Sequence, residues 1–566
     1  MGYAELSTDV AVIGAGAAGL ACAVALKSLG VDTAVFEKTS LIGGTTAASG
    51  GSVWIPLTRQ ALDAGMSDTS EAAATYLDAV IGEWADPSIR AAFLAKGPEA
   101  LAFFEQISTL AFKVRRNSPD YHQEEPGATD EGRVLDVNPF DARLIGAADL
   151  GRLRRPLPDH MWLGGMMLDR TDLLHLLSGH RSLKSAFHTL KLLLNYFRDR
   201  IHYPRGTRLV HGNAFMGHLI YSVRELAIDL HLDHSLESVT GGEGGVRRLQ
   251  FATPGGKISV TARQAIVFAS GGFSRNPQMV DQVRRSKNFE HYSMCSEGAT
   301  GDGIRLGVRA GGHCSERYFS GLSMAPVSVM PDDPYHRFPH LVMDRQKPGV
   351  IAVNSAGCRF TNEADSYHRF GLSMYDDNAD ADANSPAWLI IDAKGLRRYG
   401  LGRARPGPSF MFNHKLARSG YLIKASSLEI LAGKIGVPVE PFLDTIATHN
   451  EGVTQGTDVF GKGSNSYNRA LGDPGLLPAN PCLAPIKQAP FFAIKIHSGD
   501  LGSARGLVTD AQTRVLDVEG NPLEGLHAIG LDMQSMTGGT YPGPGITLGP
   551  ILTFAYIAAR KISRAV

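Results

Sequence analysis

A glycine-rich turn between a short apolar run and an alanine-rich stretch limits the fold more than any other feature of this chain. The apolar run covers residues 9–13, the turn GAGAAG covers 14–19, and the alanine-rich stretch continues to 29 before a second apolar run that ends at 36. The order strand, turn, helix, strand is that of a βαβ unit, which holds a dinucleotide at its turn. The sequence therefore predicts an α/β fold that begins with a Rossmann-like domain.

The three glycines of the turn are expected to have separate tasks. Gly14 allows the tight turn, Gly16 lets a pyrophosphate approach the backbone, and Gly19 lets the helix pack on the strand. The phosphates belong at the helix N-terminus, where unpaired N–H groups and the helix dipole favour negative charge. Glu37 ends the second strand, 18 residues after Gly19, and is placed to accept hydrogen bonds from the adenosine ribose. The expected contacts of this unit also include Ala17, Ala18 and Lys38.

Three later segments favour FAD over a nicotinamide dinucleotide. The loop GGTTAASGGSVWIP (43–56) can line the isoalloxazine ring, GATGDG (298–303) resembles a second dinucleotide contact, and EGLHAIGLD (524–532) resembles the ribityl contact of glutathione-reductase-type flavoproteins. The sequence has no second GxGxxG unit for NAD(P)H and no histidine in the 43–56 loop, so we predict non-covalent FAD. The further expected contacts are Gly44, Thr45, Thr46, Ser49, Gly51, Ser52, Gly271, Gly301, Asp302, Asp532, Gly545, Thr547 and Leu548.

These contacts come from separated parts of the chain, which indicates a discontinuous cofactor domain. We predict an FAD-binding domain of glutathione-reductase type from residues 1–140, 206–312 and 495–566, with an inserted α+β substrate and catalytic domain at 313–494. Residues 141–205 are expected to form a helical lid or insertion. Because part of this insertion is basic and amphipathic, it either packs on the core or makes a peripheral contact with a membrane surface.

Composition excludes several classes of function. The 56 basic and 56 acidic residues balance, which removes a global electrostatic reason to bind nucleic acid. No targeting segment and no run of about 20 apolar residues is evident. The sequence thus favours a cytoplasmic protein, with membrane association left open. The scattered cysteines contain no CxxC pair and predict neither a disulfide framework nor a metal site; they are Cys22, Cys295, Cys314, Cys358 and Cys482.

Three segments resemble the fumarate reductase/succinate dehydrogenase flavoprotein superfamily, and within it the 3-ketosteroid dehydrogenases. They are the loop at 43–56, VNSAGCRFTNEADSYHRF (353–370) and GGTYPGPGITLGP (538–550). The resemblance covers most of the chain and is weakest at 140–205. It implies an FAD-dependent oxidoreductase that acts on CH–CH groups, in steroid metabolism or lipid degradation.

The resemblance also separates the branches of the superfamily. Fumarate reductases place an arginine that acts as the proton donor five residues after the Asn of an RFxNE motif, where this chain has Tyr367. They also place a carboxylate-binding arginine near the start of the last helix, where this chain has Gly545. A dicarboxylate needs cationic clamps such as bidentate arginines. The substrate is therefore expected to be a small carbonyl compound, apolar at its reacting end, such as a steroid.

The ketosteroid branch implies roles for three tyrosines. Tyr541 and the backbone N–H of Gly545 would hold the C3 carbonyl oxygen, Tyr367 would remove the C2 proton, Tyr121 would assist it, and flavin N5 would take the hydride from C1. Two donors on a carbonyl stabilise the developing enolate, and losing one costs about 3–4 kcal/mol. Ionising a tyrosine at neutral pH costs roughly 4 kcal/mol, which a hydrogen bond donated by Tyr121 would lower.

Other residues and other functions stay open at this point. Tyr467 also matches a family segment, whereas His497 has no obvious task in this chemistry and is expected to be structural. Where the ketosteroid branch tends to read NExxPYDRF, this chain has Ser366 for the proline and His368 for the aspartate. The alternatives are a Δ4-(5α)-ketosteroid dehydrogenase, an enoate or fumarate-type reductase on another substrate, and a non-catalytic flavin-binding protein. The sequence specifies neither the electron acceptor nor the oligomeric state.

Overall fold

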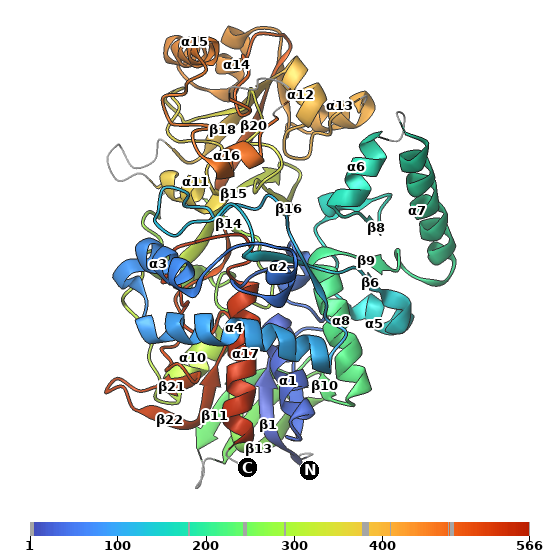
Figure 1. The fold of residues 1–566 in the computed structure, drawn as a ribbon, viewed down its shortest axis with the longest axis vertical. Coiled ribbons are helices and arrows are strands. Elements are labelled where there is room, and N and C mark those ends of the chain that lie inside the picture. The colour runs from blue at the N-terminus through green and yellow to red at the C-terminus, as the bar shows by residue number, and fades with distance from the viewer. Residues whose placement is uncertain are drawn as a thin grey trace.

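A twisted sheet next to the N-terminus forms the base of the molecule (Figure 1). The computed structural model describes residues 5–178, 182–241, 246–287, 290–375, 384–407, 409–473, 475 and 480–564. Within these residues the sheet has eight strands, and β1 at its centre runs parallel to β2 and β13. The strands lie in the order β10 (Asp229–His231), β2 (Thr33–Phe36), β1 (Glu5–Ile13), β13 (Gly256–Phe268), β12 (Arg247–Thr253) and β11 (Ser235–Gly241), while β22 (Pro522–Ala528) pairs with β13 and with β21 (Arg514–Leu516).

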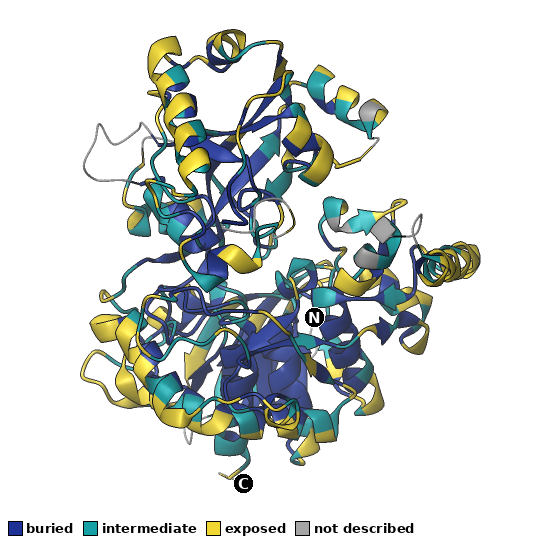
Figure 2. Ribbon diagram, turned by 45° about the horizontal axis from the view of Figure 1, so that its top comes forward, coloured by how far each residue is buried: buried dark blue, intermediate teal, exposed yellow. Residues whose placement is uncertain are grey.

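Helix α1 (Ala17–Ser28) follows the glycine turn and is buried from its first residue to Leu26. Small side chains make this possible, because they let α17 (Leu548–Ser563) and α8 (His211–Glu225) pack closely on either side of it. A Cβ atom on Gly19 would lie 1.9 Å from the carbonyl oxygen of Gly14, so only glycine permits this approach of helix to turn. Figure 2 shows the buried core that results at the base of the molecule.

A second sheet lies above the first and is built mainly from the inserted segment of the chain (Figure 1). Its long strand β20 pairs on one side with β15 and on the other with β18, and the cover includes α12 (Ala393–Tyr399), α14 (Leu428–Ile435) and α15 (Val439–Gln455). The described strands of this sheet are β14 (His291–Ser293), β15 (Leu322–Met330), β16 (Asp333–Pro339), β17 (Ile351–Val353), β18 (Ala387–Asp392), β19 (Ile423–Ala425) and β20 (Phe491–Ser503).

A helical projection stands beside the two sheets. It contains α5 (Gly146–Arg152), α6 (Arg170–Ser178) and α7 (Leu183–His202), and the short strands β6 (Phe140–Asp141) and β9 (Arg208–Leu209) pair where it leaves the body. Figure 1 shows α7 on the side of this projection that faces away from both sheets.

The pairing of two strands, β14 and β20, differs from the domain division expected from the sequence. β14 lies in the segment 206–312 assigned to the cofactor domain, and β20 spans the boundary between 494 and 495, yet both belong to the second sheet. β20 is continuous because it pairs with β18 and β19 near its start and with β15 towards its end. The domain intervals themselves stay a prediction.

Candidate active site

A cleft opens where β1, β2 and β13 end, beside the N-terminus of α1. In open α/β sheets ligands bind at the carboxyl ends of the strands. Most of the expected cofactor residues line this cleft: Gly14, Gly16, Ala17, Ala18, Glu37, Lys38, Gly44, Thr45, Thr46, Gly271 and Asp302. Gly298 and Leu531 of the predicted segments also line it, and residues that the sequence did not single out complete it, among them Thr39, Arg154, His234, Ser270, Ser296 and Ile551.

The glycine turn leaves room for a ligand at one position only. A Cβ atom on Gly16 would meet no atom within 4 Å, whereas one on Gly14 would lie 2.4 Å from the carbonyl oxygen of Ala269. Glu37 is fixed at the end of β2, because its carboxylate accepts hydrogen bonds from Ala15 N at 2.9 Å and from Thr39 N at 2.9 Å. The free space at Gly16 and the N–H groups that begin α1 fit a pyrophosphate.

Lys38 and the GATGDG segment meet across the cleft. The ammonium of Lys38 donates to Thr300 Oγ1 at 2.5 Å and to Asp302 Oδ2 at 2.6 Å. Burial alone would raise the pKa of Asp302, but the hydrogen bond and the charge of Lys38 hold that pKa below its ordinary value. Two segments that are far apart in the sequence therefore share one neutralised ion pair at the cofactor cleft.

Several expected cofactor residues lie behind the cleft wall. The buried carboxylate of Asp532 accepts hydrogen bonds from Ser270 N at 2.5 Å and Gly272 N at 3.0 Å, so it fixes the glycine turn after β13. Gly301 begins α10 (Asp302–Arg309) at φ 81°, Ser49 Oγ donates to Thr46 O, and Ser52 Oγ donates to Asp136. Their flavin contacts, with those of Gly19, Gly51, Gly545, Thr547 and Leu548, stay a prediction.

Four buried tyrosines from separate segments meet between the two sheets. The ring centroid of Tyr121 lies 5.6 Å from that of Tyr367, 4.7 Å from that of Tyr467 and 6.0 Å from that of Tyr541. The centroids of Tyr367 and Tyr541 are 5.3 Å apart. The structure therefore brings together all three tyrosines assigned from the resemblance, with Tyr467 as a fourth. His497 contacts Tyr292 and Glu290 instead.

The loop that carries Tyr541 is anchored by the loop that carries Tyr121. The carbonyl oxygen of Pro542 accepts hydrogen bonds from Tyr121 N at 2.9 Å and from the hydroxyl of Tyr76 at 2.5 Å. Gly545 has φ 94°, and a Cβ atom there would lie 2.7 Å from the carbonyl carbon of Val53. Within the described residues its N–H has no acceptor in hydrogen-bonding range, and Tyr541 Oη lies 3.4 Å from Thr547 Oγ1.

Helix α11 (Tyr367–Ser373) presents Tyr367 at its first residue. Ser366 Oγ accepts a hydrogen bond from Arg369 N at 3.2 Å, so the serine that departs from the family pattern caps this helix. Burial lowers the pKa of His368, the other departure, to about 3, and its Nδ1 accepts a hydrogen bond from Met324 N at 3.0 Å. Both departures are thus accommodated by local contacts of the second sheet.

Burial raises the pKa of Tyr367 well above its ordinary value, and the contacts with Tyr121 and Tyr541 raise it further. This is opposite to the expected effect of Tyr121 on Tyr367. Burial also raises the pKa of Tyr121 and of Tyr467, whereas the hydrogen bond from Tyr367 lowers that of Tyr121. The phenols of Tyr121, Tyr367 and Tyr467 are therefore neutral at rest.

A buried arginine that the sequence did not single out lies beside the tyrosines. The guanidinium of Arg345 donates to four backbone carbonyl oxygens, at 2.8 Å to His340, 2.6 Å to Glu363, 2.6 Å to Asp365 and 2.8 Å to Leu341. Its charge lowers the pKa of Tyr467, against the larger opposite effect of burial. The segment DRQKPG around Arg345 matches no catalytic motif, so no sequence signal marks it.

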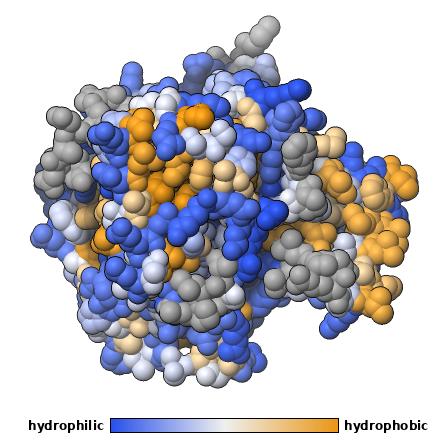
Figure 3. All heavy atoms as spheres, turned by 90° about the horizontal axis from the view of Figure 1, so that it is seen from above, coloured by the Kyte–Doolittle hydropathy of each residue, from blue (hydrophilic) through white to orange (hydrophobic). Residues whose placement is uncertain are grey.

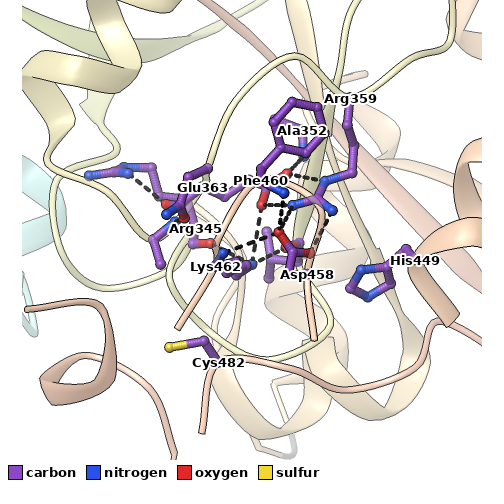
Figure 4. A network of polar contacts seen from close by, with 12 residues as sticks. Arg345, Ala352, Arg359, Glu363, His449, Asp458, Phe460, Lys462 and Cys482 are labelled. Atoms are coloured by element: carbon purple, nitrogen blue, oxygen red, sulfur yellow. Dashed lines mark hydrogen bonds and ion pairs between the residues drawn. The ribbon is translucent and has the colours of Figure 1, made fainter. Parts of the chain in front are cut away.

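An ion-pair network fixes the RFTNE segment on which Arg345 and Tyr367 depend (Figure 4). Arg359 Nε donates to Glu363 Oε1 at 2.8 Å and Arg359 Nη1 to Asp458 Oδ2 at 2.7 Å, while Lys462 Nζ lies 3.6 Å from Glu363 Oε2. Glu363 is fully buried, and Arg359 and Lys462 hold its pKa below the ordinary value against the effect of burial. Glu363 therefore pairs with Arg359 and Lys462 and supports the fold, and it is not part of the tyrosine cluster.

The comparisons with known proteins agree with this geometry. Residues 9–548 match the family model described as FAD binding domain. The chain is 36% identical to a 4-oxocyclohex-2-ene-1-carboxylate 5-dehydrogenase of Sinomonas cyclohexanicum, over 99% of this chain and 94% of the relative, and 33% identical to a 3-oxosteroid 1-dehydrogenase of Mycolicibacterium smegmatis, over 98% and 97%.

A solved structure supports the same assignment. The 3-ketosteroid delta1-dehydrogenase from Sterolibacterium denitrificans, in complex with 1,4-androstadiene-3,17-dione, superposes with a TM-score of 0.91 at 32% identity, covering 99% of this chain and 100% of that one. The predicted fold class, the FAD cofactor and the resemblance to 3-ketosteroid dehydrogenases are confirmed. The chain belongs to the FAD-binding-domain family of oxidoreductases, as a relative of the 3-oxosteroid 1-dehydrogenases.

Proposed function

We propose that this protein is an FAD-dependent dehydrogenase that forms the C1–C2 double bond in ring A of a 3-ketosteroid. The cluster of Tyr121, Tyr367, Tyr467 and Tyr541 beside the unpaired N–H of Gly545 carries the proposal, because it joins donors for a carbonyl oxygen to a candidate base. The names of relatives over nearly the whole chain support it. We place FAD in the cleft at Gly16, held without a covalent bond.

FAD supplies the acceptor for a hydride that leaves carbon C1. The residues act on the other side of the reaction. Tyr541 and the N–H of Gly545 donate to the ketone oxygen at C3 and stabilise the negative charge that develops there. Tyr367 in its deprotonated form takes the proton from C2, and Tyr121 and Tyr467 relay that proton from one phenol to the next towards solvent, with the charge of Arg345 beside Tyr467. Loss of a proton from C2 and of a hydride from C1 leaves the C1–C2 double bond.

A monocyclic ketone is the second candidate substrate. The 36% identical relative is named for 4-oxocyclohex-2-ene-1-carboxylate, which has a ring ketone like a steroid but carries a carboxylate at its far end. Two arginines are close enough to affect the tyrosines: the charge of Arg115 lowers the pKa of Tyr121, and Tyr121 raises the pKa of Arg170, against the effect of burial on each. Because Arg115 is already paired with the carboxylate of Asp136, Arg170 is the cation better suited to a substrate carboxylate.

The test is a comparison of two substrates on the purified holoenzyme with an artificial electron acceptor. We expect 4-androstene-3,17-dione to be oxidised with a higher kcat/KM than 4-oxocyclohex-2-ene-1-carboxylate, and mass and NMR spectra to place the new double bond at C1–C2. A preference for the monocyclic acid, lost in Arg170→Met, would support the second candidate. 5α-Androstane-3,17-dione, whose ring A is saturated, tests the Δ4-(5α) alternative. Its oxidation at C4–C5 rather than C1–C2, or oxidation of none of the compounds, would overturn the first.

Variants of the tyrosines connect the activity to the site. Tyr367→Phe and Tyr541→Phe should each lower kcat by about a hundredfold or more, since each removes one proton-transfer group or one carbonyl donor. Tyr221→Phe on α8 is the matched control, because Tyr221 contacts Phe140 rather than the cluster. Wild-type activity in both cluster variants would place the chemistry elsewhere.

A further inference from the structure

Helix α7 carries a row of large apolar side chains that face solvent. Leu183, Phe187, Leu190, Leu194, Phe197 and Ile201 are between 53% and 91% exposed. Their spacing alternates between four and three residues, which places all six on one face of the helix. We call this row the α7 stripe. Figure 3 shows hydrophobic residues gathered on the part of the molecule that projects to the right, where Figure 1 places α6 and α7.

Polar contacts on the opposite face of α7 hold the helix with the α7 stripe towards solvent. Tyr196 donates to the carbonyl oxygen of Leu163 at 2.7 Å, and Asp199 accepts from Thr207 Oγ1 at 2.7 Å. Nearer the start of α7, His188 Nε2 lies 2.9 Å from Asp172 Oδ1. Because the inner face of α7 is attached at both ends, the helix cannot turn its apolar row inward without breaking these contacts.

Three basic residues of α7 lie along one edge of the stripe, while Arg200 donates to the carbonyl oxygen of Tyr203 at the end of the helix. Lys184, Lys191 and Arg198 are exposed, and each directly follows a stripe residue at intervals of seven positions. The one acidic residue between Leu183 and His202 is Asp199, which is buried and bonded to Thr207. The exposed face is thus apolar with a basic border, a combination that complements an anionic lipid surface.

The same charges disfavour a second copy of this chain as the partner. The spacing of the stripe would suit a coiled coil, in which flanking acidic and basic residues pair between helices. Two copies of α7 would bring basic borders together and would offer no exposed acid to pair with them. No helix in the described part of the chain is long and apolar enough to cross a membrane, so the helix can only lie in the plane of the surface.

We propose that α7 anchors the protein on anionic membrane surfaces, with the α7 stripe inserted between the lipid headgroups and Lys184, Lys191 and Arg198 on their phosphates. The proposal stands on the exposed face of α7 and does not depend on the proposed substrate. It also resolves the choice left open for residues 141–205 in favour of a surface contact, since the apolar face of α7 is turned away from the core.

Flotation of the FAD-loaded protein with vesicles tests the anchor. We expect binding to vesicles of phosphatidylcholine mixed with phosphatidylglycerol, weaker binding to phosphatidylcholine alone, and a fall in affinity of about tenfold or more for Leu190→Gln with Leu194→Gln. The matched control is Leu62→Gln with Leu144→Gln, two leucines that are each 55% exposed outside α7. Flavin content and thermal melting of each variant show that its fold is kept.

Charge reversal tests the basic border separately. The combined Lys184→Glu, Lys191→Glu and Arg198→Glu substitutions should abolish the preference for phosphatidylglycerol. The same reversal of exposed Arg248, Lys394 and Arg397 should keep it. Absence of wild-type binding to either vesicle, or equal binding by the stripe variant, would overturn the proposal. So would a wild-type dimer in sedimentation velocity that the stripe variant converts to a monomer, because the stripe would then be a contact between copies.

Discussion

Arg345 is the residue whose position explains most about the tyrosine cluster. It is a fully buried cation that donates to four backbone carbonyl oxygens and acts on Tyr467 through its charge. A buried cation favours the ionised form of a nearby phenol. We therefore regard Arg345 as a positioning residue that acts on the tyrosine cluster through Tyr467 and does not itself contact the substrate.

The pH dependence of catalysis tests this role. A phenol acting as base works in its deprotonated form, so activity rises as pH increases through the pKa of the cluster. Removing the charge in Arg345→Met should move the half-maximal pH of kcat/KM upward by about one unit or more, and Arg345→Lys should restore part of the shift. A variant that loses rate equally at every pH would show that Arg345 only supports the fold.

The tyrosines could be predicted from the sequence, and Arg345 could not. Tyr367, Tyr541 and Tyr121 stand in segments with recognisable spacing, so the resemblance brought them together before any coordinates. Arg345 stands in a loop, and its importance arises from the carbonyl groups that converge on it from His340, Leu341 and the RFTNE segment. Convergence of backbone atoms from separate loops leaves no pattern in a sequence.

At the scale of elements, substitutions in the glycine turn and in α1 distinguish a glycine needed for cofactor binding from one needed for folding. Gly16→Ala adds a methyl group where the structure has free space, while Gly19→Ala places one 1.9 Å from the carbonyl oxygen of Gly14. Gly16→Ala should keep the thermal midpoint of the FAD-free protein and weaken FAD binding about tenfold or more, because the methyl group occupies the approach of the pyrophosphate. Gly19→Ala should lower both quantities. Titration of the FAD-free protein with FAD, followed by flavin fluorescence, distinguishes the two.

The ion-pair network before α11 is expected to contribute strongly to stability. Glu363→Gln leaves Arg359 and Lys462 buried without their carboxylate and should lower the free energy of unfolding by about 3–5 kcal/mol. The surface pair of Glu83 and Arg317 supplies the control, since Glu83 is 72% exposed and Glu83→Gln should cost less than about 1 kcal/mol. Urea unfolding measures both. Equal losses in the two variants would contradict the importance given to burial.

The α7 segment shows what periodicity alone leaves open. The sequence predicted an amphipathic helix, and α7 is one, but an amphipathic pattern states only that one face is apolar. Whether that face packs on a core or faces outward depends on Tyr196 and Asp199, which are bonded to loops on the inner side. The direction of the helix is set by contacts with residues outside it.

At the scale of the whole molecule, buried histidines predict acid sensitivity. Burial lowers the pKa of His122, His218, His368, His449, His497 and His527 to between about 3 and about 4. The unfolded chain binds protons at these side chains below about pH 6.5, where the folded chain does not, so stability present above that pH is lost as pH falls towards the folded values. Each contributes a slope of about 1.4 kcal/mol per pH unit.

Urea midpoints measured from pH 7 downward check this expectation. The midpoint should fall steeply below about pH 6.5, and His527→Gln should reduce the steepness. His202 is exposed at the end of α7, so His202→Gln should leave the steepness unchanged. A midpoint that stays constant down to about pH 5 would exclude the histidines as the cause.

The distance in sequence between paired strands decides how far each of the two sheets could be predicted. The sheet around β1 was predictable because its βαβ unit is contiguous. The strand β20 instead belongs to a sheet whose first described strand, β14, begins at His291, about 200 positions earlier. Pairing between distant strands depends on loop closure and side-chain fit rather than on local pattern. The boundaries between the two sheets were therefore the least predictable part of the fold.

The hydrogen bonds that Tyr76 and Tyr121 donate to Pro542 in the Tyr541 loop have a consequence for synthesis of the protein. Tyr76 and Tyr121 leave the ribosome early, but the carbonyl oxygen that both of them bond belongs to a residue made more than 400 positions later. Helix α17, which packs beside α1 under the cofactor cleft, is made later still. A nascent chain thus carries an incomplete pocket through most of translation, and the Tyr541 loop is fixed in place only after Pro542 has been made and α17 has docked.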